Sequence, residues 1–167
     1  MPAIIGIVGV SGSGKTTLIE RIIPLLRERG LRIGTLKHDA HGFDVDKPGK
    51  DTWRHREAGA EVVVISGPEK IACIRRVAEA PSPEALIAFL MPDMDLVLVE
   101  GFKRFGFPKL EVVRAANSQS PVTSPDGLSG LVTDLPLSLP DVPTYGLDDL
   151  EAIAHRIVEL AGMARHG

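Results

Sequence analysis

The stretch GVSGSGKT at residues 9–16 decides the fold. It fits the pattern G-x-x-x-x-G-K-[ST] at every fixed position, and it lies between an apolar run at residues 3–8 and a segment with helical spacing at residues 15–29. Its glycines allow the backbone to wrap around a phosphate with N–H groups pointing inward, and the start of a helix adds partial positive charge. The sequence therefore predicts a phosphate-binding P-loop between a buried strand and a helix.

The side chains of this loop have separate predicted tasks. Lys15 is expected to neutralise β- and γ-phosphate oxygens, and Thr16 is expected to hold Mg²⁺. The alternative is a glycine-rich strand-to-helix turn that fits the pattern by chance. The predicted nucleotide-binding residues of this region are Gly9, Ser11, Gly12, Ser13, Gly14, Lys15, Thr16 and Thr17.

Outward from the loop, short apolar runs alternate with helical patterns. The run at residues 95–99 is continuously apolar after its first residue, as in parallel strands buried on both faces, and residues 61–66 suggest another buried strand. Asp148, three residues before Glu151, resembles a capping box that starts a last helix. We predict the α/β class, with a mainly parallel sheet flanked by helices, as one P-loop domain over residues 1–167. Further strands are predicted at residues 31–37, 70–76, 110–113 and 128–132, and helices at 52–58 and 83–90.

The net charge and the apolar runs of the chain limit the classes of partner that we expect. A net charge of −3 provides no general attraction for nucleic acid or anionic lipid, so neither a nucleic-acid nor a membrane partner is expected. No apolar run approaches the ~18 residues needed to cross a bilayer, and the expected setting is cytoplasmic. The single cysteine, Cys73, stands among apolar neighbours, which predicts a buried position in a strand.

Glu100 is the predicted second acidic group of the site. It closes the apolar strand at residues 95–99, where a carboxylate reaches the shell of a Mg²⁺ ion held by the P-loop. With Lys15 it forms the predicted catalytic pair, and with Thr16 the predicted metal ligands. Asp95, at the other end of the same strand, is expected at the far edge of the sheet. The alternative for Glu100 is a solvated turn residue before Gly101.

Two further segments carry many charges. Residues 37–51 contain histidines, aspartates and lysines without apolar periodicity, which leaves a transition-metal site, a solvated loop or a ligand-contacting switch-like loop open. The carboxylate spacing does not follow that of a calcium loop. Lys103, Arg104 and Lys109 follow Glu100 closely and are expected to bring positive charge to the same sheet edge, either for an anionic ligand or for solubility.

Taken together, these stretches resemble the MobB family of GTP-binding proteins, which are associated with attaching a nucleotide to molybdopterin. The resemblance covers roughly residues 3–134, and in this chain Ala40 and Gly42 replace a histidine and an acidic residue frequent in the family. The motifs that carry it are GVSGSGKTTL at residues 9–18, KH at 37–38, FDVDKPGKD at 43–51, REAGA at 56–60 and LVEGFK at 98–103.

The resemblance implies a GTP-binding protein with weak GTPase activity that uses Mg²⁺ and forms a homodimer. It also implies two partners: a nucleotidyltransferase of molybdenum cofactor synthesis, and molybdopterin or its guanine dinucleotide. For that second ligand we expect Lys37, His38, Lys50 and Lys103, because Lys and His gather where ligands of open α/β sheets collect. Asp134 ends a predicted strand as the family's base-recognition strand does, so it is the expected acceptor for guanine; the alternative is a turn residue before Pro136.

Rival functions start from the same loop. A small-molecule or nucleoside kinase also opens with such a glycine-rich motif, although residues after Ala80 show no arginine-rich closing segment. A carrier that binds GTP without turnover is the third possibility.

Overall fold

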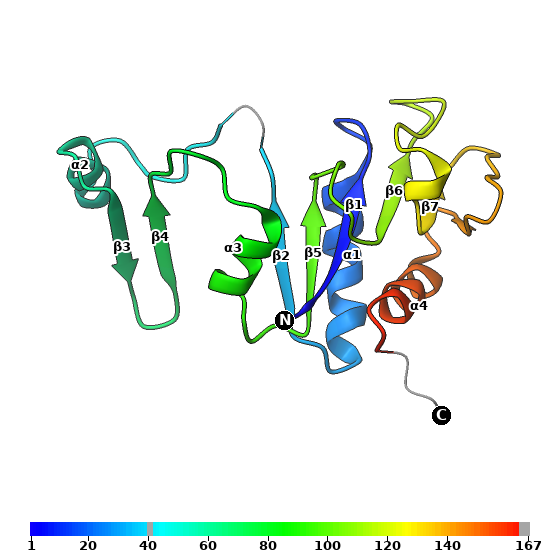
Figure 1. Ribbon diagram of the computed structural model, residues 1–167, viewed down its shortest axis with the longest axis horizontal. Helices are drawn as coiled ribbons and strands as arrows, with labels where there is room; N and C mark the ends of the chain where they lie inside the picture. Colours follow the sequence, from blue (N-terminus) through cyan, green and yellow to red (C-terminus); the bar gives the residue numbers. More distant parts are fainter. Residues whose placement is uncertain (40–41, 164–167) are drawn as a thin grey trace. The chain divides into compact units, whose positions relative to one another are not determined.

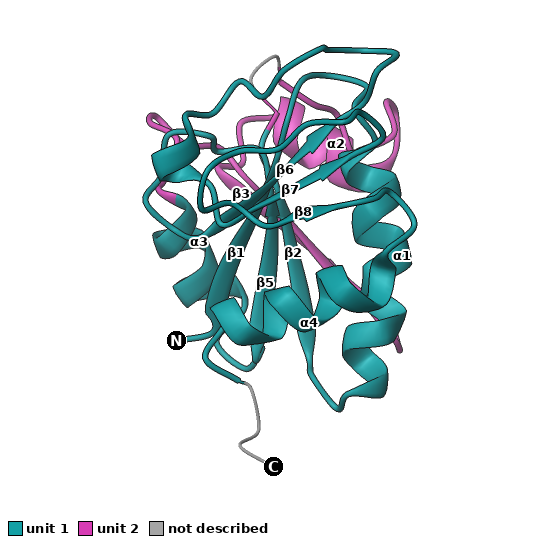
Figure 2. Cartoon of the chain, turned by 90° about the vertical axis from the view of Figure 1, so that its right-hand side faces the viewer, with its two compact units in different colours: residues 1–38, 83–167 teal, residues 39–82 magenta. Residues whose placement is uncertain are grey.

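The computed structural model describes residues 1–39 and 42–163. The chain divides into two compact units, unit 1 with residues 1–38 and 83–167 and unit 2 with residues 39–82 (Figures 1 and 2). The expectation of one domain over the whole chain stays a prediction.

Unit 1 is built around a six-stranded sheet with the order β2-β5-β1-β6-β7-β8 (Figure 1). Every neighbouring pair is parallel, so the carboxyl ends of the strands share one edge. This arrangement confirms the predicted α/β class and the mainly parallel sheet. The strands are β1 (Ala3–Val8), β2 (Ile33–Lys37), β5 (Leu96–Glu100), β6 (Lys109–Val113), β7 (Gly130–Thr133) and β8 (Thr144–Tyr145).

Helices cover both faces of this sheet. Helices α1 (Lys15–Glu28) and α4 (Leu150–Leu160) bury Ile22 and Ile157 on the face formed by alternate strand residues such as Leu98. Helix α3 (Pro83–Leu90) packs Ile87 against the opposite face. Strand β5 is buried on both sides over residues 96–99 and is continuously apolar there, as expected, whereas the equally buried β6 includes Lys109 and Glu111. Among the described residues, no helix is both long and apolar enough to span a membrane.

The start of α4 differs from the predicted one by a single residue. The N-cap is Asp149, whose Oδ2 accepts the N–H of Gly146 at 2.8 Å. The predicted capping box at Asp148 is therefore wrong, and Asp148 is left to pair with Arg21, Nη2 to Oδ1 at 2.8 Å.

Unit 2 contains helix α2 (Asp51–Glu57) and a separate antiparallel pair, β3 (Val62–Ser66) and β4 (Ile71–Arg75). The strands are joined by a turn in which Gly67 N–H donates to Lys70 O. Two predictions of burial fail here: within β3 only Val63 is buried, and Cys73 in β4 is exposed. Burial on both faces requires layers on each side, which a two-stranded ribbon does not supply by itself. Apolar runs alone do not distinguish these situations.

Candidate functional site

The P-loop follows β1 at the carboxyl edge of the sheet. Gly9, Gly12 and Gly14 all have positive φ, at 140°, 75° and 94°. A Cβ at Gly9 would lie 2.4 Å from the carbonyl oxygen of Val112, so a side chain has no room there. The glycine spacing is therefore a direct requirement of the backbone path, as the sequence predicted.

Lys15 lies over its own loop. Its Nζ donates to Val10 O at 2.7 Å and to Gly9 O at 3.3 Å. Partial burial lowers the pKa of Lys15, and Lys103 and Lys37 lower it further, while Glu100 acts in the opposite direction. An anionic ligand in the loop would relieve this effect because it favours the charged amine.

Thr16 and Glu100 meet at the same edge. The Thr16 hydroxyl donates to Glu100 Oε2 at 3.0 Å, and Lys37 Nζ lies 3.7 Å from Oε1. The Glu100 side chain is only 13% exposed, which fits a site residue better than a solvated turn residue. Strand pairing explains the contact, since Glu100 lies opposite Ile7 on β1 and Lys37 on β2.

A hydroxyl and a carboxylate are oxygen ligands of the kind that Mg²⁺ prefers, with waters and phosphate oxygens filling the remaining positions. Thr16 and Glu100 therefore fit this ion. No group of three or more His, Cys, Asp and Glu side chains suited to a metal occurs in the described part of the chain. His41, one of the histidines in the charged loop, lies outside the described residues.

A row of aromatic rings, formed by His38, Phe102 and Phe105, lies near Glu100. The sequence did not indicate this packing. The rings of His38 and Phe102 lie 4.3 Å apart, and Phe105 packs edge-on to Phe102 at 5.2 Å. Phe102 adopts a positive φ of 50°, a strained conformation for a bulky residue. The backbone N–H of His38 donates to the backbone carbonyl oxygen of Glu100 at 3.0 Å. The aromatic row is therefore hydrogen-bonded to the residue that supplies the carboxylate.

The predicted contribution of Lys109 to the positive edge stays a prediction. Lys109 begins β6 opposite Gly6, one residue before the level at which Ile7 pairs with Glu100, and it is nearly buried, at 6% exposure. Its Nζ donates to Phe105 O at 2.7 Å and to Lys103 O at 2.9 Å. Lys109 thus holds the β5–β6 connection, whereas the Lys103 side chain stays exposed.

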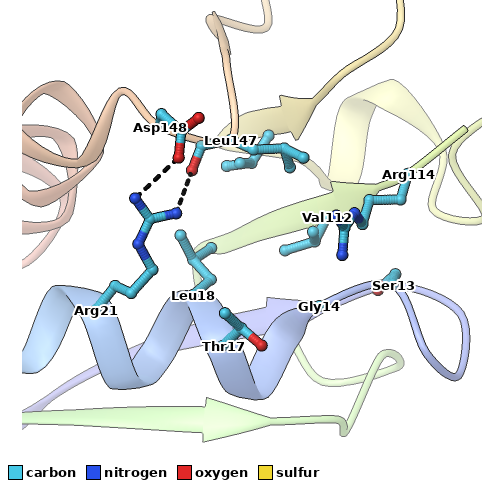
Figure 3. A pocket seen from close by; sticks show the side chains of 10 residues that line it. Ser13, Gly14, Thr17, Leu18, Arg21, Val112, Arg114, Leu147 and Asp148 are labelled. Carbon is cyan, nitrogen blue, oxygen red and sulfur yellow. Dashed lines mark hydrogen bonds and ion pairs between the residues drawn. The ribbon is translucent and has the colours of Figure 1, made fainter.

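A cavity opens on the other side of the P-loop, toward β6, β7 and the residues after β8 (Figure 3). Thr17, Arg114 and Asp148 contribute to its walls. Ser13 also lines it, and its hydroxyl is buried without a hydrogen-bond partner among the described atoms. On one wall, Arg21 is engaged by Asp148 and by the carbonyl oxygen of Leu147 at 3.3 Å.

Asp134 follows β7, as predicted, but it has a local partner. Its Oδ1 accepts the backbone N–H of Ala115 at 2.8 Å. Its second carboxylate oxygen accepts no hydrogen bond from the described residues, and the predicted role in guanine recognition stays a prediction. Lys50 lies in unit 2 as the N-cap residue of α2, and its predicted ligand contact also stays a prediction.

The structure thus brings together most of the predicted site residues at the carboxyl edge of unit 1: the P-loop, Glu100, Lys37, His38 and Lys103. The functional candidates that the sequence did not reveal are Phe102, Arg114 and Asp148. Of these, only Phe102 had a signal, as part of the LVEGFK stretch; the others become visible only when distant segments are placed side by side.

Comparison with known proteins agrees with this geometry. Residues 4–134 match the family model of molybdopterin guanine dinucleotide synthesis protein B, MobB. A molybdopterin-guanine dinucleotide biosynthesis adapter protein of Escherichia coli (strain K12) is 38% identical over 157 residues, 89% of this chain and 87% of that protein. One from Haemophilus influenzae is 39% identical over 140 residues, 81% and 77% of the two chains.

Solved structures show the same fold. The crystal structure of a molybdopterin-guanine biosynthesis protein B is 35% identical and superposes with a TM-score of 0.73 over 94% of this chain and 99% of that one. Bacillus subtilis MobB superposes with a TM-score of 0.72 at 26% identity, over 93% and 98% of the two chains. The fold is that of a P-loop NTPase, and the chain belongs to the MobB family.

Proposed function

We propose that this protein binds GTP with Mg²⁺ at the P-loop, hydrolyses it slowly, and serves as an adapter in the synthesis of molybdopterin guanine dinucleotide. The observation that carries the proposal is the contact of the Thr16 hydroxyl with Glu100 beside Lys15. The adapter role rests on the similarity to molybdopterin-guanine dinucleotide biosynthesis adapter proteins.

The residues of the site divide the work. Lys15 neutralises β- and γ-phosphate oxygens, and the loop's N–H groups hold the remaining phosphate oxygens. Thr16 and Glu100 hold Mg²⁺, which supplies positive charge to the transferring phosphoryl group. Asp134 accepts hydrogen bonds from guanine through the oxygen that Ala115 leaves open.

The second ligand of the proposal is molybdopterin or its guanine dinucleotide. Lys37, His38 and Lys103 provide positive charge and donors near Glu100, and the His38–Phe102 pair adds ring surface on which a flat pterin can stack. The predicted contribution of Lys50 is part of the same proposal. The protein would act as a homodimer in the cytoplasm, with a molybdenum cofactor nucleotidyltransferase as its protein partner.

Calorimetry with Mg·GTP and Mg·ATP, followed by hydrolysis assays on both, tests the proposal. We expect tight binding of GTP, weaker binding of ATP and slow phosphate release that needs no acceptor. Phosphate transfer to an added sugar, nucleoside or pterin acceptor would instead establish a kinase. Absence of GTP binding would refute the proposal.

A further inference from the structure

The connection between β6 and β7 lies against the P-loop. A Cβ at Gly14 would lie 3.8 Å from a guanidinium nitrogen of Arg114, and one at Gly12 would lie 2.8 Å from the side-chain amide of Asn117. Figure 3 shows Arg114 at the end of β6, close to Ser13 and Gly14. This connection thus places one cationic side chain directly beside the predicted phosphate site.

The two arginines of the cavity differ in their partners. Arg21 is neutralised by Asp148 at 2.8 Å. Arg114 takes part in none of the ion pairs formed by the described residues, and its side chain is exposed. An unneutralised guanidinium next to a loop built for phosphate is suited to bind the oxygens of a phosphate group.

Glu111 holds the β6–β7 connection in place. It is fully buried in β6, and its two carboxylate oxygens accept the N–H groups of Val122 at 2.7 Å and Thr123 at 2.9 Å. A buried carboxylate is unfavourable unless hydrogen bonds satisfy it, so Glu111 stabilises the conformation of the connection that brings these two N–H groups to it. Asp134 fixes the other end of the segment through Ala115.

The side of the P-loop on which Arg114 lies indicates which phosphate it meets. Thr16 is directed toward Glu100, the side on which Mg²⁺ and the terminal phosphates would lie, and Lys15 lies over the loop within electrostatic reach of the same carboxylate. Arg114 lines the cavity on the other side, together with Thr17 and Gly14. That cavity has a volume of about 150 Å³, less than the roughly 300 Å³ of small ligand pockets, so it holds only part of a nucleotide.

We propose that Arg114 binds the α-phosphate of the nucleotide, and that Glu111 is a positioning residue that holds the connection carrying Arg114. This inference rests on the proposed function, because it requires a nucleotide in the P-loop. It goes further in naming a cationic ligand for the phosphate nearest the nucleoside.

The test compares GTP, GDP and GMP. Arg114→Met should weaken binding of GTP and GDP by a similar factor, roughly tenfold or more, and should weaken binding of GMP as well, because the α-phosphate is present in all three. Arg114→Lys should recover part of the loss, since an ammonium keeps the charge but not the forked donor geometry. Arg27→Met, on an exposed position in the last turn of α1, makes the same change in net charge and should leave the affinities for GTP and GDP within about twofold.

Three results would overturn the assignment of Arg114. Unchanged affinity for GTP and GDP would remove it from the site, a loss confined to GTP would place it at the γ-phosphate, and a loss for GTP and GDP without one for GMP would place it at the β-phosphate. A parent protein that binds neither nucleotide would refute the proposed function itself, which keeps the two failures distinguishable.

The positioning role of Glu111 is tested by coupling. Glu111→Gln keeps one acceptor but turns an amide toward the second N–H, so GTP and GDP should both bind more weakly. In a double-mutant cycle, adding this change to Arg114→Met should cost little more affinity, whereas a merely structural role would give additive losses. If Glu111→Gln does not fold, Glu111→Asp replaces it in the cycle, and additive losses there would equally reject the role.

Discussion

The two ends of strand β5 carry one carboxylate each, and they have different tasks. Glu100, at the carboxyl end, accepts the Thr16 hydroxyl and lies near Lys37. Asp95, just before the amino end, accepts the backbone N–H of Arg32 at 2.7 Å and pairs with its guanidinium at 3.3 Å. The same type of group is therefore directed at a ligand site at one edge of the sheet and at the local backbone at the other.

Lys15 and Lys109, which both donate to backbone carbonyl oxygens, show the same contrast between a ligand-directed group and a supporting group. Burial lowers the pKa of both Lys15 and Lys109. Lys15 lies on the P-loop near Glu100, Lys37 and Lys103, whereas Lys109 donates to two carbonyl oxygens of the β5–β6 connection. Around β5 the ligand-directed carboxylate lies at the carboxyl edge, where ligands of open α/β sheets bind, and the supporting carboxylate lies at the amino end. Lys109, which begins β6 opposite Gly6, shows that supporting groups also occur near the carboxyl edge. Substitutions at the two edges should accordingly alter different measurements.

The largest effect is expected at the carboxyl edge. Lys15→Ala removes the charge that pairs with the β- and γ-phosphates, so Mg·GTP affinity should fall roughly a hundredfold or more. The melting midpoint should change little, because the hydrogen bonds that Lys15 makes with the described residues all go to its own loop. Calorimetry measures the first and thermal unfolding the second. Parent-like affinity in this variant would end the case for a P-loop nucleotide site.

A smaller effect on the same edge is expected for Glu100→Gln. The amide keeps the size of the side chain but loses the charge that Mg²⁺ requires, so hydrolysis should fall by roughly tenfold while metal-free nucleotide binding changes little. A Mg²⁺ titration of the hydrolysis rate is the measurement. A rate that matches the parent at every Mg²⁺ concentration would return Glu100 to the role of a turn residue.

These two predictions use residues that the sequence already identified, and the reason is local. The P-loop is one contiguous stretch whose glycines are dictated by its own backbone, and Glu100 stands at the end of an unmistakably apolar strand. Arg114 and Glu111 carried no such signal. Their roles depend on which strands are neighbours and on the path of the chain from residue 114 to residue 123, and neither follows from periodicity.

Lys109 and unit 2 show the same limit in other ways. Lys109 belongs to a charged stretch that continues from Glu100, yet its side chain is nearly buried and its Nζ donates to two backbone carbonyl oxygens, which the sequence does not reveal. The run at residues 61–66 has the composition of a buried strand, but pairing with β4 leaves most of it exposed. The pattern correctly predicts a strand there, and the predicted burial is wrong.

An intermediate effect is expected at the end of β7. Asp134→Asn keeps an oxygen that can accept the Ala115 N–H, so the connection should stay in place. The other atom of the amide is then an NH₂ group, which cannot accept the guanine donors as the open carboxylate oxygen does, and the preference for GTP over ATP should fall roughly five- to hundredfold, a loss of about 1–3 kcal/mol. Competition between the two nucleotides measures it. An unchanged ratio would locate base recognition elsewhere.

The smallest effect is expected at Asp95. Hydrogen bonds from the Arg32 side chain and backbone lower the pKa of Asp95 below its usual 3.8. The folded protein therefore holds this proton less tightly than the unfolded chain, so the stabilising contribution is present above pH ~4 and is lost as the pH falls through the lowered pKa. Asp95→Asn should lower the melting midpoint by about one or two degrees at neutral pH, because exposed pairs contribute little, and by less at pH 3.

This last change also tests the contrast between the two ends of β5. Because Asp95 supports only the chain around Arg32, Mg·GTP affinity and Mg²⁺-dependent hydrolysis of Asp95→Asn should match those of the parent at neutral pH. Glu100→Gln is the matched variant, since it makes the same change in charge on the same strand and should alter hydrolysis with little change in midpoint. If Asp95→Asn reduced hydrolysis as strongly as Glu100→Gln does, the division of labour between the edges of the sheet would be wrong.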